Sequence, residues 1–222
     1  MAGYLLVFDL DGTLVDSAAG LRAALNELLR ERGHEPLSLP QVKAMIGDGV
    51  PALVARALAA AGSESGDSAT ALARFTELYE AGAVQWTRPY PRVAETLTEL
   101  RRRGYQTAVC TNKLQRSSLV VLDGLGLLPL FDQIAGGDRF AVKKPDPGHL
   151  LALIAALGAR PEAAAMIGDS ENDAAAAHAA RLPLILMRYG YCRGDPEGLA
   201  AAALLDDFAE LPAALDRLGL AP

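Results

Sequence analysis

The sequence is poor in cysteine and has no long hydrophobic run. Its 222 residues include two cysteines, Cys110 and Cys192, which is too few for a disulfide scaffold and suits reduced thiols in a cytoplasmic protein. No apolar stretch approaches the ~20 residues that a transmembrane helix needs. The segment 1–8 has no basic residue before its short apolar run, so we expect no signal peptide. We therefore expect a soluble protein of the cytoplasm.

Basic and aromatic residues are also scarce. Lys and Arg number 21 against 27 Asp and Glu, which gives a formal net charge of −6. An acidic chain without basic runs binds nucleic acid and anionic membranes poorly, so we expect neither as a partner. Aromatic residues make 5% of a chain that is 51% hydrophobic and rich in Ala and Leu, which favours helices over an all-β fold.

Short apolar runs alternate with helical segments after residue 86. Strands are predicted at 4–8, 105–110, 132–135, 164–167, 183–187 and 203–205, and helices at 93–103, 115–124, 147–157, 171–180 and 208–218. Strands that alternate with helices are typical of a parallel sheet covered on both faces. The pattern predicts an α/β protein with a doubly wound, Rossmann-like sheet.

The first strand is separated from the second by a long helical segment. Helices are predicted at 17–32, 50–61 and 68–82, and no convincing strand lies between 16 and 85. This segment is far longer than an ordinary strand-to-helix connection. We therefore expect a catalytic core formed by 1–15 and 86–222, and an inserted helical cap at 16–85.

Polar clusters follow four of the predicted strands. They are Asp9-Leu10-Asp11-Gly12-Thr13, Thr111-Asn112, Lys144-Pro145, and Gly168-Asp169 with Asp173 beyond it. In an open α/β sheet, ligands bind beyond the carboxyl ends of the strands. We expect these clusters to form a single site.

The first cluster carries two carboxylates close together. Asp9 and Asp11 repel each other unless a cation separates them or one of them holds a proton. A metal ion would fix one carboxylate, and a proton would make the other a general acid. Gly12 presents a backbone N–H that suits a phosphate, and Asp169 adds another hard oxygen ligand, a set that favours Mg²⁺.

The four clusters, in this order along the whole chain, resemble the motifs of the haloacid dehalogenase superfamily of phosphotransferases. They are DLDGT at 9–13, TN at 111–112, Lys144 before a proline, and GDSEND at 168–173. The resemblance implies that Asp9 is the nucleophile, which forms an aspartyl-phosphate. It implies that Asp11 protonates the leaving alcohol and then activates water.

The resemblance also implies the ligands of the metal and of the phosphate. Mg²⁺ would be held by the Asp9 carboxylate, the Asp11 backbone carbonyl and Asp169. The transferring phosphoryl group would be bound by Gly12, Thr111, Asn112 and Lys144. Asp173 would support Lys144 or the waters bound to the metal.

The helical segment resembles the cap of phosphoglycolate phosphatases at Ile46-Gly47-Asp48-Gly49. Such a cap implies a small phosphorylated metabolite as substrate, and we expect 2-phosphoglycolate. Gly47 and Gly49 would shape the specificity loop, although a plain turn between helices also explains them. Lys43 and Arg56 flank this loop and are the expected cations for the substrate carboxylate. The chain departs from these relatives at Arg92, where glycine is commoner.

Several alternatives stay open. Within the superfamily they are a β-phosphoglucomutase, a pyrophosphatase, a nucleotidase and a phosphonatase, which needs a cap lysine. Outside it, receiver modules of response regulators also combine strand-end Asp, Thr and Lys with Mg²⁺.

The histidines His34, His149 and His178 do not cluster, so we expect surface or capping positions for them. The sequence leaves open whether the protein is a monomer or a homodimer.

Overall fold

The computed structural model describes residues 3–63 and 68–222 and contains a parallel six-stranded sheet. The strand order is β5-β4-β1-β6-β7-β8. The strands are β1 (Leu5–Phe8), β4 (Gln106–Cys110), β5 (Gln133–Ala135), β6 (Ala164–Gly168), β7 (Leu184–Met187) and β8 (Ala203–Leu205). Most are continuous apolar runs, as expected for parallel strands buried on both faces.

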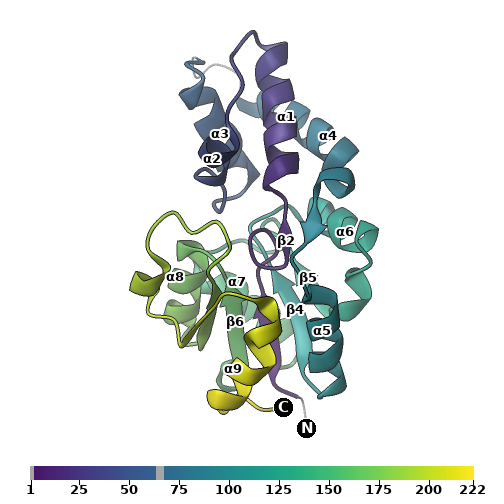
Figure 1. The fold of residues 1–222 in the computed structure, drawn as a ribbon, viewed down its shortest axis with the longest axis vertical. Coiled ribbons are helices and arrows are strands. Elements are labelled where there is room, and N and C mark those ends of the chain that lie inside the picture. Colours follow the sequence, from purple (N-terminus) through teal and green to yellow (C-terminus); the bar gives the residue numbers. More distant parts are fainter. Residues whose placement is uncertain (1–2, 64–67) are drawn as a thin grey trace.

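Helices cover both faces of the sheet (Figure 1). Side chains alternate between the faces along β1: Leu6 and Phe8 join one core, while Leu5 and Val7 join the other. The first core includes α5 (Val93–Arg102), α6 (Gln115–Gly124) and α9 (Leu211–Arg217), and the second includes α7 (Pro147–Ala156) and α8 (Glu171–Ala180). The predicted doubly wound α/β fold is confirmed.

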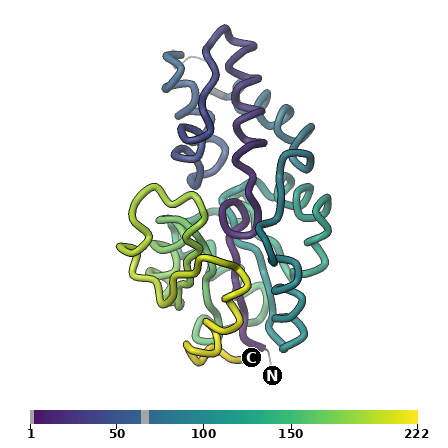
Figure 2. The backbone as a smooth tube through the Cα atoms, in the orientation of Figure 1, coloured from purple at the N-terminus to yellow at the C-terminus, as the bar shows by residue number. Residues whose placement is uncertain are grey.

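Four helices form a separate layer beyond the carboxyl edge of the sheet, at the end of the molecule opposite both termini (Figures 1 and 2). They are α1 (Ala18–Glu31), α2 (Leu39–Lys43), α3 (Val50–Ala60) and α4 (Ser68–Trp86). An antiparallel ribbon of β2 (Val15–Asp16) and β3 (Arg88–Pro89) lies where this layer meets the sheet. The sequence did not predict the ribbon. The helix predicted at 68–82 continues to Trp86.

The closing helix predicted at 208–218 is divided. A 3₁₀ turn covers Phe208–Glu210, and α9 begins at Leu211. Pro212 has no N–H to donate to the carbonyl four residues earlier, so a regular α-helix cannot run through this point with all its hydrogen bonds.

The expected surface position of His149 is wrong. This residue is fully buried in α7. Helical spacing places it on the same buried face as Leu153, and its ring packs edge-on against Phe140. Cys110, by contrast, is buried at the end of β4, as a small apolar residue would be.

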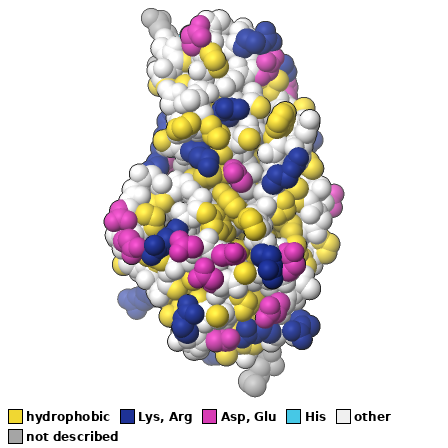
Figure 3. Space-filling model, in the orientation of Figure 1, with side chains coloured by type: hydrophobic (Ala, Val, Ile, Leu, Met, Phe, Trp, Pro, Cys, Tyr) yellow, Lys and Arg dark blue, Asp and Glu magenta, His cyan; other side chains and the backbone are white. Residues whose placement is uncertain are grey.

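Among the described residues, no helix is long and apolar enough to cross a membrane. The face of the molecule in Figure 3 carries acidic and basic side chains interspersed with apolar ones. No basic field dominates this face, which agrees with the net negative charge.

Candidate active site

Three adjacent strands deliver polar residues to the same edge of the sheet. Phe8 in β1 pairs with Val109 in β4 and with Ile167 in β6, so the three strands end level with one another. Asp9 follows β1 directly, and its N–H donates to the Ile167 carbonyl at 2.9 Å. Thr111 and Asp169 leave the two neighbouring strands beside it. The chain changes direction across the sheet at β1, where ligands of open α/β sheets bind.

A cluster of buried carboxylates lies at this edge. Asp9, Asp169 and Asp173 each offer an oxygen, and these oxygens lie within 4.8 Å of one another. Burial raises the pKa of Asp9 to about 7, with Lys144 opposing the rise and Asp173 adding to it. Burial, Asp173 and Asp9 also hold the pKa of Asp169 well above its usual range. Ionised carboxylates this close together repel one another, and a divalent cation such as Mg²⁺, which prefers hard oxygen ligands, would offset that repulsion.

Asp169 is held in place on both of its oxygens. Thr13 donates its hydroxyl to one at 2.7 Å, and the Tyr191 N–H donates to the other at 2.7 Å. Gly12 lies against the same carboxylate: a Cβ at this position would sit 2.2 Å from an Asp169 oxygen, and the backbone has φ +94°. Both the contact and the left-handed backbone require glycine here.

Lys144 is buried among the carboxylates. Its Nζ lies 2.6 Å from Asp173 Oδ1 and 3.1 Å from Asp9 Oδ1. Burial favours the neutral amine, but Asp173 and Asp9 outweigh it and raise the pKa of Lys144, so the ammonium form persists. The other Asp173 oxygen accepts the Ser170 N–H and hydroxyl at the start of α8. Asp173 therefore anchors Lys144 beside Asp9.

A second buried lysine, Lys113, lies at the site, and no sequence motif had indicated it. Its Nζ lies 3.1 and 3.2 Å from the two Asp11 carboxylate oxygens and donates to the Tyr79 hydroxyl at 2.8 Å. Although burial opposes it, Asp11 raises the pKa of Lys113. The available signal was its position, because Lys113 directly follows Thr111 and Asn112 at a strand end.

The loop between α2 and α3 is tied to the core. The Asn112 side chain donates to the Gly47 carbonyl at 3.0 Å, and the Asn172 amide donates to Asp48 at 2.6 Å. Arg193 donates to the other Asp48 oxygen at 3.0 Å. These contacts hold the loop over the carboxyl edge of the sheet.

The two cap cations expected at the substrate contact other residues of the protein. Arg56 pairs with Asp48 and donates to the Met45 carbonyl at 2.9 Å. Lys43 Nζ lies 5.5 Å from the centre of the Tyr191 ring. Neither side chain is among the described residues that line the cavity. Their contact with the substrate stays a prediction.

A cavity of about 40 Å³, room for a few water molecules, lies between the helical layer and the sheet. The core contributes Asp9, Asp11, Thr111, Asn112 and Lys113, and the helical layer contributes Leu21, Ile46, Gly47, Gly49, Val50 and Leu53. The core side of the cavity is polar and charged, while its other side is mostly apolar. Such a space suits a small anionic ligand.

The chain resembles known proteins over nearly its whole length. It is 43% identical to a phosphoglycolate phosphatase of Rhodospirillum rubrum, covering 98% of this chain and 95% of that protein. It is 40% identical to a phosphoglycolate phosphatase of Caulobacter vibrioides, covering 96% and 90%. The crystal structure of a predicted phosphoglycolate phosphatase from Haemophilus somnus superposes with a TM-score of 0.91 at 31% identity, covering 96% and 98%.

A second solved structure and a family model agree with these relatives. CbbY from Rhodobacter sphaeroides, solved with phosphate, superposes with a TM-score of 0.83 at 28% identity, covering 96% of this chain and 99% of that one. The family model for haloacid dehalogenase-like hydrolases matches residues 5–181. The chain therefore belongs to the haloacid dehalogenase-like hydrolases.

Proposed function

We propose that this protein is a Mg²⁺-dependent phosphatase that hydrolyses 2-phosphoglycolate through an aspartyl-phosphate. The observation that carries the proposal is the setting of Asp9. Its carboxylate is buried at the end of the central strand, 3.1 Å from Lys144, within a cluster of carboxylates. Relatives named phosphoglycolate phosphatase, at 40–43% identity, support the choice of substrate.

The metal would be held by the Asp9 carboxylate, the Asp11 backbone carbonyl and Asp169. Bound there, Mg²⁺ supplies positive charge to the transferring phosphoryl group and favours the ionised form of Asp9. Asp173 remains with Lys144, whose ammonium its carboxylate contacts at 2.6 Å. Lys144, Thr111 and the backbone near Gly12 and Asn112 bind the phosphoryl oxygens.

The reaction proceeds in two displacements at phosphorus. An Asp9 oxygen attacks the phosphorus while the bond to the glycolate oxygen breaks, and Asp11, protonated at this stage, gives its proton to that oxygen. Asp11 then takes a proton from a water, whose oxygen attacks the phosphorus of the aspartyl-phosphate. The bond to Asp9 breaks, so inorganic phosphate leaves and the free carboxylate returns.

We propose that residues 16–85 act as a lid on the core of 1–15 and 86–222. The apolar side chains it gives to the cavity exclude water and offer a sugar few hydrogen-bond partners, which favours a small acid over a hexose phosphate. A phosphonatase would need a cap lysine at the cavity. Lys43 is the single lysine in 16–85 and lies over the Tyr191 ring instead. We place the protein in the cytoplasm, as a monomer or homodimer.

The test is hydrolysis of a panel of small phosphate esters by the wild type and by Asp9→Asn, with Mg²⁺ present. We expect the highest kcat/KM for 2-phosphoglycolate and a loss on the order of 10³ or more in Asp9→Asn. Asp123→Asn, the same substitution on the exposed surface of α6, is the matched control and should retain activity. Hydrolysis at the wild-type rate by Asp9→Asn refutes the mechanism, and a preference for hexose phosphates or pyrophosphate refutes the substrate.

A further inference from the structure

Lys113 is the single cation among the described residues that line the cavity. The other charged lining residues are Asp9 and Asp11, and Lys144 is not in the lining. A ligand with negative charge at both ends therefore meets one positive side chain in this wall. The part of the ligand that lies away from the phosphate would be drawn toward Lys113.

The ammonium group of Lys113 makes two of its three hydrogen bonds to one carboxylate. A lysine carries three N–H donors. In the described part of the chain, Lys113 Nζ contacts the Asp11 carboxylate, at 3.1 and 3.2 Å, and the Tyr79 hydroxyl, at 2.8 Å. Two of these three contacts go to the same carboxylate, so a ligand carboxylate can replace one of them while Asp11 keeps the other.

The contact with Asp11 places Lys113 relative to the reacting atoms. In the proposed mechanism Asp11 protonates the oxygen that leaves phosphorus, so its carboxyl group lies beside that oxygen. In 2-phosphoglycolate a single methylene separates this oxygen from the carboxylate. A cation that touches Asp11 lies where that carboxylate would be.

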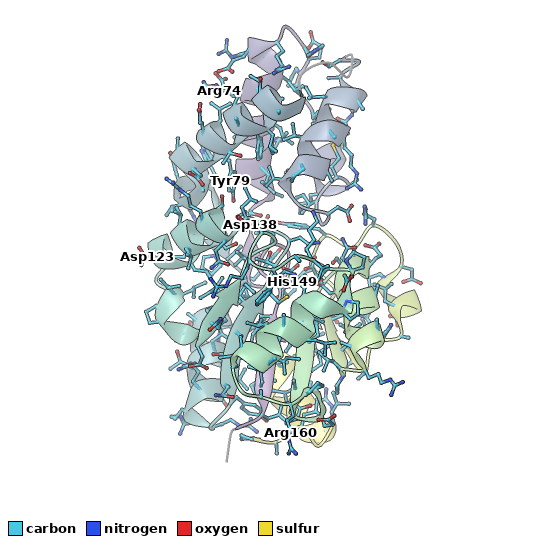
Figure 4. The ribbon with its side chains drawn as sticks, turned by 180° about the vertical axis from the view of Figure 1, so that it is seen from behind. Arg74, Tyr79, Asp123, Asp138, His149 and Arg160 are labelled. Atoms are coloured by element: carbon cyan, nitrogen blue, oxygen red, sulfur yellow. The ribbon has the colours of Figure 1, made fainter. Side chains whose placement is uncertain are left out.

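We propose that Lys113 binds the carboxylate of 2-phosphoglycolate and sets the preference of the enzyme for a phosphorylated acid. The inference rests on the proposed function, because the carboxylate belongs to the proposed substrate. It moves the recognising cation from the cap, where the sequence suggested Lys43 and Arg56, to the core. The cap instead contributes Tyr79, which holds the ammonium from α4 at the boundary between the two layers (Figure 4).

The surroundings strengthen such an ion pair. The Lys113 side chain is 2% exposed, and the cap gives the cavity Leu21, Ile46, Val50 and Leu53. Charges separated from water by apolar walls attract each other more strongly than charges at a surface. Before the substrate arrives the ammonium is already paired with Asp11, so it does not stand as a lone buried charge.

The experiment compares 2-phosphoglycolate with ethyl phosphate, which keeps the phosphate and the methylene but has a methyl group in place of the carboxylate. The kcat/KM ratio of the two substrates is measured for the wild type, Lys113→Met, Lys113→Arg, Lys43→Met and Arg56→Met. We expect Lys113→Met to lower this ratio on the order of 10- to 100-fold, as the loss of a charged hydrogen bond would. Lys113→Arg should restore part of it, and the two cap variants should keep it.

The outcomes separate the inference from the proposed function. A wild type that hydrolyses neither substrate, or that does not prefer 2-phosphoglycolate, refutes the proposed function and with it the inference. A wild type with the preference and a Lys113→Met variant that loses activity on both substrates equally overturns the inference alone, because a purely structural role through Asp11 moves both reactions together. A loss of the ratio in Lys43→Met or Arg56→Met, with Lys113→Met unchanged, also overturns it.

A crystal structure of Asp9→Asn with 2-phosphoglycolate and Mg²⁺ tests the inference even if the Lys113 variants do not fold. The expected result is a carboxylate oxygen about 2.7–2.9 Å from Lys113 Nζ. A carboxylate held by Lys43 or Arg56, or one turned toward solvent, contradicts the assignment.

Discussion

A buried histidine behind the active site makes the stability of this protein depend on pH. His149 is fully buried in α7 (Figure 4), and among the described residues neither ring nitrogen has a hydrogen-bond partner. Burial lowers the pKa of His149 to about 4, Lys144 adds to the effect, and the backbone of Gly136 opposes part of it. The folded protein therefore holds this ring neutral at any pH well above 4.

The sign and size of the effect follow from linkage. The unfolded chain titrates this ring near pH 6.5, so between about pH 6.5 and 4 the unfolded state binds a proton that the folded state does not. The contribution of the neutral His149 ring to the free energy of unfolding is present above pH 6.5 and is lost as the pH falls toward 4. Between pH 7 and pH 5 the loss from this group is about 2 kcal/mol.

The perturbation is His149→Leu, which removes the titrating group and keeps an apolar side chain of similar size. At pH 7 we expect a free energy of unfolding within about 1.5 kcal/mol of the wild type, because leucine is apolar and similar in size to the buried ring. At pH 5 the free energy of unfolding of the variant, relative to the wild type, should be higher than at pH 7 by about 2 kcal/mol. Urea unfolding followed by circular dichroism measures both, with exposed His178→Leu as control. An equal difference between His149→Leu and wild type at the two pH values refutes the reasoning.

Two further predictions concern buried polar contacts. Lys144→Met leaves the fully buried Asp173 carboxylate without its cation. We therefore expect the free energy of unfolding, measured with urea, to fall by about 3–5 kcal/mol. An unchanged free energy of unfolding contradicts this prediction. At the start of α1, the Tyr191 hydroxyl accepts the Ser17 N–H at 2.9 Å and donates to Asp16 at 2.6 Å. Tyr191→Phe removes both hydrogen bonds and should lower the free energy of unfolding by about 1–3 kcal/mol, which a thermal melt would show as a lower Tm. An unchanged Tm would contradict this prediction.

The core elements could be predicted because their signals are local. The helices at 115–124 and 171–180 and the strand at 203–205 have the predicted bounds, since each is a periodic or apolar run that ends at a turn. The ribbon of β2 and β3 could not be predicted. Each strand has two residues, too few for periodicity, and their pairing joins positions that are distant along the chain.

The position of Arg92 shows how the structure explains a departure seen in the sequence. The resemblance to phosphoglycolate phosphatases marked this residue as unusual in place of glycine. In the structure it is the N-cap of α5 with φ 64°, a left-handed conformation that glycine adopts without strain. The sequence marked the position, but the reason lies in the backbone.

The partners within the site are set by the fold rather than by sequence spacing. The motif resemblance suggested roles for Asp9 and Asp11, which follow β1, and for Lys144, which lies in the loop between β5 and α7. The pairing of Lys113 with Asp11 spans 102 positions, and that of Tyr191 with Asp16 spans 175. No periodicity or local motif encodes such contacts, because they depend on strand order and on the cap.

The two lysines divide the negative charge of the site between them. Lys144 contacts Asp173 and Asp9, while Lys113 contacts Asp11 on the side that faces the cap. Before Asp11 takes up the proton that it gives to the leaving oxygen, the carboxylates of Asp9, Asp11, Asp169 and Asp173 and the two ammonium groups leave a formal charge of −2. The ion proposed at Asp9 and Asp169 carries the opposite charge. A protein with net charge −6 can then accept a phosphate beside Asp9, where Lys144 and the proposed ion supply positive charge, and a carboxylate beside Lys113.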